Sequence, residues 1–133
     1  MSDTKATDFL ILNKNKNESR SLAKMIENFG LNVVACLSDS QSVIDIVKEK
    51  KIDVALIDIG LKDDIDGIKC AHILKNNFNI KIIILSNNED RSTEILDLEP
   101  ESFHIKPFKR IHLKIAIRLM ESKFDRNMKV IKR

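Results

Sequence analysis

Short runs of β-branched and other apolar residues alternate along this chain with longer amphipathic stretches, and this alternation constrains the fold more than any other feature. The runs that predict strands lie at residues 9–12, 32–36, 54–57, 81–85 and 103–105. Several of them are apolar throughout, which is typical of parallel strands covered on both faces. The sequence therefore predicts an α/β fold with a doubly wound, five-stranded parallel sheet and helices on both faces.

Apolar residues at helical spacing fill the segments between these runs. The boundary signals are Gly30 as the stop of the first helix, Ser40 as the N-cap of the second and Asp66-Gly67 as the start of the third. A short pattern around Ile95 and Leu96 predicts a fourth helix. The fifth follows Pro107 and carries an apolar stripe of Leu113, Ala116, Ile117 and Met120.

The length of 133 residues fits one domain. We expect residues 1–7 to form a flexible N-terminal tail, residues 8–122 the domain, and residues 123–133 a basic C-terminal helix extension or tail. The last helix carries apolar residues at alternating steps of four and three, with the polar Asn127 at one position of the series. The apolar members are Leu113, Ile117, Met120, Phe124 and Ile131. Such a seam predicts a helix that runs past Ser122 and meets a partner helix, as in a homodimer, and a frayed tail is the alternative.

Composition excludes several classes of protein. Apolar residues make up 43% and charged residues 32%, with two prolines and three glycines, which excludes disordered and low-complexity chains. No apolar run approaches the roughly 18 to 20 residues that span a bilayer, and the N-terminus is polar, so we expect a cytoplasmic protein that does not contact membranes. Cys36 and Cys70 lie in apolar patterns without metal-type spacing, which predicts small buried thiols.

Polar residues follow the predicted strands at the points where ligands bind in open α/β sheets. They are Asn13-Lys14-Asn15 after the first strand, Asp58-Ile59-Gly60 after the third, Ser86-Asn87-Asn88 after the fourth and Lys106-Pro107-Phe108 after the fifth. A carboxylate, a hydroxyl and a lysine are thus expected to converge on one edge of the sheet.

Three of these segments resemble the receiver family of two-component signalling. IDVALIDIGLKDDIDGI is similar to its phosphoacceptor strand and loop, IIILSNN to its hydroxyl strand, and FHIKPF to its lysine-proline segment. The resemblance extends from Asp8 to about Ser122. It implies the flavodoxin-like strand order 2-1-3-4-5 and a partner that is a histidine kinase or phosphotransfer protein, or an output domain or protein.

The resemblance also implies a role for each residue. Asp58 would accept the phosphoryl group, Lys106 would contact a phosphoryl oxygen, and Ser86 would hydrogen-bond another. Ser86 and Phe103 would form the switch, and Pro107 is a candidate for a cis peptide bond. The alternative from the residues alone is a turn-capping Asp58, a loop hydroxyl at Ser86, a solvated Lys106 and a core Phe103.

One position departs from the family pattern, because Asn13-Lys14 stands where receivers carry two adjacent acidic residues that hold Mg²⁺. Only Asp58, the Gly60 carbonyl and the Asn13 amide would remain as ligands, so we expect no metal and no other cofactor. A rescue of the metal site would need Glu18, or Asp63, Asp64 or Asp66 in the following loop. Lys14 is expected to replace the metal with its own charge, within salt-bridge or water-bridged reach of Asp58, and the alternative places Lys14 in solvent.

Two hypotheses of function follow. The first is an atypical receiver module regulated without Mg²⁺-dependent phosphorylation, and the second is a working phosphoacceptor that catalyses, at most, its own phosphorylation and dephosphorylation at Asp58. A flavodoxin-like cofactor binder would need a Gly-, Ser- or Thr-rich loop after the first strand, which NKNKNES does not provide. Arg110, Lys114 and Arg118 form a basic row, but with a net charge of +3 the row indicates a solvated helix face rather than a nucleic-acid site.

Overall fold

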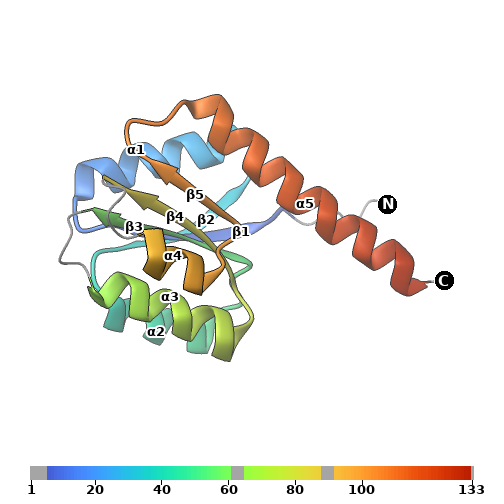
Figure 1. Ribbon diagram of the computed structural model, residues 1–133, viewed down its shortest axis with the longest axis horizontal. Coiled ribbons are helices and arrows are strands. Elements are labelled where there is room, and N and C mark those ends of the chain that lie inside the picture. Colours follow the sequence, from blue (N-terminus) through green and yellow to red (C-terminus); the bar gives the residue numbers. More distant parts are fainter. Residues whose placement is uncertain (1–5, 61–64, 88–91, 133) are drawn as a thin grey trace.

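A computed structural model of the chain describes residues 6–60, 65–87 and 92–132, and it describes side chains within 6–59, 67–87 and 93–122. Strands and helices alternate along the chain (Figure 1). The strands are β1 (Asp8–Leu12), β2 (Asn32–Leu37), β3 (Val54–Gly60), β4 (Lys81–Ser86) and β5 (Ser102–Ile105). The helices are α1 (Lys16–Asn28), α2 (Ser40–Glu49), α3 (Ile65–Phe78), α4 (Ser92–Leu98) and α5 (Arg110–Lys132).

The strands form one parallel sheet in the order β2-β1-β3-β4-β5. This confirms the predicted fold class and strand order. The central strands β1, β3 and β4 are the most apolar runs of the sequence, and burial on both faces explains why they do not alternate. The register of β3 against β4 is irregular between Asp58 and Gly60, so the ladder is locally disturbed next to the candidate phosphoacceptor.

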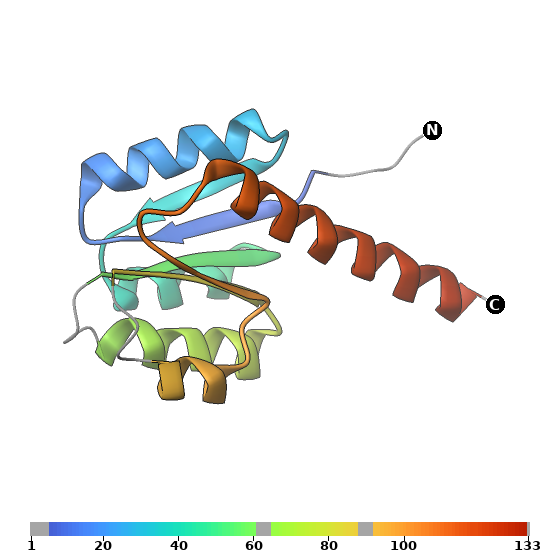
Figure 2. The ribbon, with the colours of Figure 1, turned by 45° about the horizontal axis from the view of Figure 1, so that its top comes forward.

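Two apolar layers cover the sheet, one on each face (Figure 2). Helices α1 and α5 pack on one face, where Phe9 and Ile11 of β1 meet Leu22 of α1 and Leu113 of α5. Helices α2, α3 and α4 pack on the other face, against Leu10 and Leu12 among other residues. Successive residues of β1 therefore serve opposite layers, as the period of a strand requires.

Helix ends follow the local chemistry of the sequence, with one correction. Gly30 has a φ of 90° just beyond α1, a backbone conformation that glycine adopts without strain. The prediction that Ser40 caps α2 was wrong, because Asp39 is the N-cap and its carboxylate accepts a hydrogen bond from the Ser42 backbone N–H at 2.8 Å. A carboxylate one residue earlier reaches the free N–H groups of the first turn, and Ser40 becomes the first helical residue.

The fourth helix is short, with seven residues. Ile95 and Leu98 bury their side chains in the core, whereas Leu96 is exposed. From α3, the Lys75 ammonium donates to the Leu98 carbonyl at 2.6 Å and to the Glu99 carbonyl at 3.0 Å. A lysine near carbonyls at a helix C-terminus opposes the negative end of the helix dipole, so α3 holds α4 in place.

Helix α5 runs past the amino ends of the strands (Figures 1 and 2). The first part of the predicted seam is intramolecular, since Leu113, Ile117 and Met120 are buried against the sheet. The side chains of Phe124, Asn127 and Ile131 lie outside the described ones, so the homodimer stays a prediction. Of the two free cysteines, Cys70 is buried as predicted, whereas the prediction of a buried thiol was wrong for Cys36, which is exposed because β2 is an edge strand.

Candidate functional site

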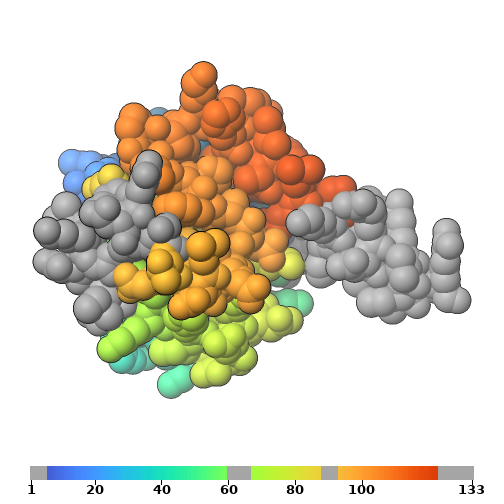
Figure 3. All heavy atoms as spheres, viewed as in Figure 1, coloured from blue at the N-terminus to red at the C-terminus, as the bar shows by residue number. Residues whose placement is uncertain are grey.

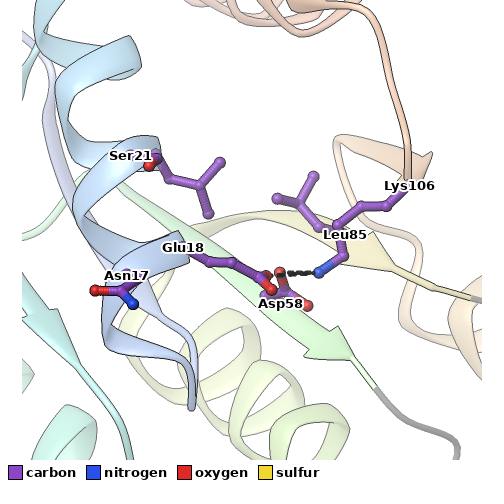
Figure 4. Close-up of a pocket in the computed structure, with 7 residues that line it drawn as sticks. Asn17, Glu18, Ser21, Asp58, Leu85 and Lys106 are labelled. Carbon is purple, nitrogen blue, oxygen red and sulfur yellow. Dashed lines mark hydrogen bonds and ion pairs between the residues drawn. The ribbon is translucent and has the colours of Figure 1, made fainter.

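The carboxyl ends of the parallel strands bring the predicted polar residues together at one edge of the sheet. Asp58 lies near the end of β3, Ser86 ends β4 beside it, and Lys106 follows β5. Asn13 follows β1, and its backbone N–H bonds to the Leu37 carbonyl of β2 at 3.0 Å. In Figure 4 the Lys106 side chain extends toward Asp58, while Glu18 reaches the same point from the first turn of α1.

Asp58 and Lys106 form a short ion pair. The Lys106 Nζ lies 2.6 Å from Asp58 Oδ2, and the Asp58 side chain is only 3% exposed. A buried carboxylate of this kind needs a compensating charge or several hydrogen bonds, because its desolvation is costly. Lys106 provides that charge from the neighbouring loop.

Glu18 and Asn13 close this pair into a ring of four side chains. Lys106 Nζ also donates to Glu18 Oε1 at 3.0 Å. The Asn13 amide Nδ2 donates to Asp58 Oδ2 at 3.0 Å and to Glu18 Oε1 at 3.4 Å. Two carboxylates thus share two donors, one cationic and one neutral, and each donor bridges both acceptors.

A hydrogen bond to the side-chain oxygen of Asn13 determines the orientation of its amide group. The Asn13 Oδ1 oxygen accepts a hydrogen bond from the Asn15 backbone N–H at 2.8 Å, so the NH₂ group must face the carboxylates. Mg²⁺ requires oxygen ligands, and at this position a nitrogen donor points into the site. The residues at the end of β1 therefore do not fit the divalent cation that the receiver resemblance implies.

Hydrogen bonding in the ring holds Glu18 and Lys106 in their charged forms. Hydrogen bonds from Lys106 and Asn13 lower the pKa of Glu18. Burial acts to lower the pKa of Lys106, but the hydrogen bonds and charges of Asp58 and Glu18 outweigh it, and the pKa is raised. Lys106 therefore remains a cation at neutral pH.

A cavity of about 320 Å³ opens beside the ring. It is lined by Glu18, Ser21 and Leu22 of α1, by Leu85 of β4, and by Asp58 and Lys106. A second cavity of about 80 Å³ lies on the other side of Asp58, where Lys14 lines it together with Ser38 and Gly67. Asp58 thus adjoins space on two sides although its own side chain is almost inaccessible.

The remaining predicted residues occupy distinct places. Lys14 is exposed and shares the smaller cavity with Asp58, and its salt bridge to Asp58 stays a prediction. Ser86 is 2% exposed, directly beside Gly60 in the β3–β4 ladder. Phe103 is half-buried against the layer of α2, α3 and α4. The Lys106–Pro107 peptide bond is cis.

Glu18 enters the site in a role that the sequence does not reveal, because its partner Lys106 is 88 residues away. A local signal exists, however. Asn15 caps α1 by accepting the Glu18 backbone N–H at 3.0 Å, so Glu18 belongs to the first turn of a helix that begins at the site edge. The other acidic candidates for metal rescue, Asp63, Asp64 and Asp66, have side chains outside those that the structure describes.

The basic row of α5 has intramolecular partners. The Arg110 guanidinium lies 5.3 Å and the Lys114 ammonium 5.9 Å from the centroid of the Phe29 ring. Arg118 donates to the Phe29 carbonyl at 2.8 Å and to Glu121 at 3.1 Å. These cation–π and hydrogen-bond contacts fasten α5 to the end of α1.

The part of the chain that the structure describes offers neither a cluster of metal ligands nor a membrane-spanning helix. Within residues 6–60, 65–87 and 92–132, no group of three or more His, Cys, Asp or Glu side chains is arranged to hold a metal ion. None of the helices in these ranges is both long enough and apolar enough to cross a membrane.

Comparisons with known proteins agree with the geometry. The family model described as the response regulator receiver domain matches residues 9–118. The isolated REC domain of RcsB from Salmonella enterica serovar Typhimurium, solved with phosphomimetic BeF3-, is 22% identical, has a TM-score of 0.77 and aligns over 89% of this chain and 90% of that chain. No curated protein matches the sequence.

Two further solved structures show the same likeness. The response regulatory domain of protein mrkE from Klebsiella pneumoniae is 16% identical, with a TM-score of 0.79 over 90% of this chain and 99% of that chain. A response regulator receiver domain protein from Clostridium thermocellum is 21% identical, with a TM-score of 0.76 over 90% of this chain and 97% of that chain. At these identities the likeness establishes the fold alone.

Proposed function

Because the chain belongs to the response regulator receiver domain family of two-component signalling, we propose that it is an atypical receiver that signals without Mg²⁺-dependent phosphorylation. The observation that carries this proposal is the Asn13 amide, whose NH₂ group faces Asp58 while its oxygen is held by the Asn15 N–H. A hydrogen-bond donor occupies the place where the family keeps a metal ligand.

The charges of the site support the same conclusion. Lys106 already lies between the two carboxylates, Asp58 and Glu18, at 2.6 and 3.0 Å. Lys106 therefore neutralises one of the two carboxylate charges that a divalent cation would need, which weakens the attraction of the site for such a cation. Exposed Lys14 beside the smaller cavity adds a second positive charge on the approach to Asp58.

In this proposal the ring sets one resting conformation, and regulation comes through binding of a partner. The partner class is a histidine kinase or phosphotransfer protein, or an output domain or protein, in the cytoplasm. Ser86 and Phe103 keep the switch role that the family implies, in which Ser86 hydrogen-bonds at the site and Phe103 packs against the layer that includes α4. Nucleic acid is not the proposed partner, since the basic row of α5 is engaged with Phe29.

A second function is favoured by one observation, the Lys106–Asp58 pair beside a cavity of about 320 Å³. In that alternative, an Asp58 carboxylate oxygen attacks the phosphorus of a phosphohistidine. The new O–P bond forms as the N–P bond breaks, and the imidazole nitrogen keeps the electron pair and takes up a proton. Lys106 would neutralise charge on the transferred group.

Intact mass measured after incubation with acetyl phosphate, with and without millimolar Mg²⁺, separates these functions. We expect little or no gain of a phosphoryl group by the wild type and no response to Mg²⁺. The Asn13→Asp and Lys14→Asp double variant should gain Mg²⁺ binding and Mg²⁺-dependent phosphate, and adding Asp58→Asn should abolish that gain. Mg²⁺-dependent phosphorylation of the wild type at Asp58 would instead establish the second function.

A further inference from the structure

The cavity beside Asp58 combines an apolar lining with a few polar groups. Leu22 of α1 and Leu85 of β4 contribute aliphatic carbon. Asn17 and Ser21, both exposed residues of α1, contribute an amide and a hydroxyl. In Figure 3 the start of α1, in blue, reaches the surface beside the end of β4, in yellow. Such a lining is typical of sites for small organic ligands, and the volume of about 320 Å³ lies at the small end of their range of roughly 300–1,000 Å³.

The charges that line this cavity favour a monovalent cation. Among the described residues they come from the carboxylates of Asp58 and Glu18 and from the ammonium of Lys106. Two negative charges and one positive charge leave one negative charge in excess. An anion would be repelled by two carboxylates and attracted by one ammonium, whereas a cation reverses both relations. The cation Lys14 lines the smaller cavity on the other side of Asp58 instead.

Glu18 is the member of the ring whose carboxylate has an unused oxygen. Its Oε1 atom accepts from Lys106 at 3.0 Å and from Asn13 at 3.4 Å, and within the described residues Oε2 has no hydrogen-bond donor. The side chain is 49% exposed, so a ligand can reach this oxygen without displacing a buried group. A carboxylate oxygen of this kind can accept a charge-assisted hydrogen bond from an ammonium group.

The two leucines select an organic cation rather than a metal ion. A divalent cation such as Mg²⁺ surrounds itself with oxygen ligands and water, and the side chains of Leu22 and Leu85 offer no oxygen. The alkyl chain of an amine can lie against both leucines. A guanidinium is less suitable, because it prefers two carboxylate oxygens at once and Glu18 has one that is unused.

We propose that this cavity binds a small alkyl primary amine. The ammonium group of the amine donates to Glu18 Oε2, and the alkyl chain packs against Leu22 and Leu85. The hydrogen bond between Glu18 and Lys106 links α1 to the segment after β5, and a second cation at Glu18 weakens that link. The amine is thus an input signal of the module. This regulatory role rests on the proposed function, whereas binding itself is tested independently of it.

The test is an NMR titration of the isotopically labelled full chain with ethylamine, propylamine and butylamine at pH 7. Butylamine should bind with a dissociation constant in the millimolar range, as a ligand of this size allows, and should shift the amide signals of Glu18, Leu22 and Leu85. Each added methylene group should tighten binding about fourfold, because it buries apolar surface. Butyrate and butanol are the matched ligands without a positive charge, and neither should shift these signals.

Glu18→Gln is the variant that tests the charged contact. It should weaken butylamine binding at least about tenfold, because the ammonium group loses a charged acceptor. Glu27→Gln is the matched control, since Glu27 is also an exposed glutamate of α1 but is not among the residues that line the cavity. It should leave binding unchanged.

The proposal is overturned if butylamine does not bind, if butyrate or butanol binds equally well, or if affinity does not rise with chain length. It is also overturned if Glu18→Gln binds butylamine as the wild type does, or if Glu27→Gln weakens binding as much as Glu18→Gln. The intact-mass measurement with acetyl phosphate separates these failures from a failure of the proposed function. A wild type that stays unphosphorylated and binds no amine overturns this inference alone. Mg²⁺-dependent phosphorylation of the wild type overturns the proposed function, and with it the role of the amine as the input signal.

Discussion

Asp8 lies at the amino ends of the parallel strands, here called the amino edge, and Asp58 lies at their carboxyl ends, the carboxyl edge. Both are buried, at 9% and 5% exposed, and each accepts a hydrogen bond from an asparagine amide. At the amino edge, Asn32 Nδ2 donates to Asp8 Oδ1 at 2.7 Å. At the carboxyl edge, Asn13 Nδ2 donates to Asp58 Oδ2 at 3.0 Å. The two sites share their residue types, and they differ in what surrounds the pair.

Two further hydrogen bonds of Asp8 involve its own backbone groups. The Asp8 N–H donates to Asp53 Oδ2 at 2.8 Å, and the Asp53 N–H returns a bond to the Asp8 carbonyl at 2.9 Å. Around Asp58 the neighbours are the charged side chains of Lys106 and Glu18, next to a cavity. The same Asp–Asn pair thus ties strands together at one edge and forms part of a charged centre at the other.

The largest expected effect comes from removing the cation of that centre. Lys106→Met should lower the free energy of unfolding by about 3 kcal/mol at pH 7, because Asp58 would stay buried without its counter-charge. Urea denaturation measures the loss. The raised pKa of Lys106 means that its contribution is complete below the ordinary value of 10.5 and is lost only as the pH rises above it, so the difference from wild type should narrow in strong alkali.

Asp58→Asn supplies the control for this variant. In the Lys106→Met background it removes the buried carboxylate charge that Lys106 had balanced, so most of the lost stability should return. If the double variant is as unstable as Lys106→Met alone, packing of the lysine stem explains the loss better than charge. The proposed difference between a charged centre at Asp58 and a strand-tying pair at Asp8 would then lose support.

A smaller effect is expected at the amino edge. Asn32→Ala should cost about 1 kcal/mol, because Asp8 loses a hydrogen bond in a partly exposed position where water replaces part of it. Urea denaturation again measures the change. Reactivity with acetyl phosphate and the response to Mg²⁺ should stay as in the wild type, and a change in either would show that the edges are coupled.

The smallest effect concerns Glu18, whose side chain is 49% exposed. Glu18→Gln should lower the free energy of unfolding by less than about 1 kcal/mol at pH 7. Since the pKa of Glu18 is lowered in the folded protein, its contribution is present above the ordinary value of 4.5 and disappears as the pH falls through the folded value. The free energies of unfolding of the wild type and of Glu18→Gln should therefore converge as the pH is lowered from 7 to 3. A difference that stays constant over this range would argue against the ion pair.

The fold was largely predictable from the sequence because the central strands are short, apolar and β-branched. Every predicted strand is present. Each matches its prediction at one end and differs at the other by one to three residues, the most at the third, which was expected to end at residue 57 and extends to Gly60. The Ser40 cap was missed because Asp39 and Ser40 are both good capping residues, and periodicity does not choose between adjacent positions.

The site was predictable only in part. The convergence of Asp58, Ser86 and Lys106 follows from the rule that the carboxyl ends of parallel strands share one edge. The Lys106–Glu18 pair joins residues far apart in the chain, and the Asn13 orientation depends on one backbone N–H of the following turn. Such details depend on side-chain geometry in three dimensions, which neither periodicity nor composition encodes.

The length of α5 has a mechanical consequence. Met120 is buried in the core, and the helix continues to Lys132. At 1.5 Å per residue, those last turns form an arm of about 18 Å beyond the body of the domain. A tilt of about 10° at Met120 would sweep the tip of that arm through about 3 Å. A small change in the packing of α5 would therefore produce a larger displacement at its C-terminal end.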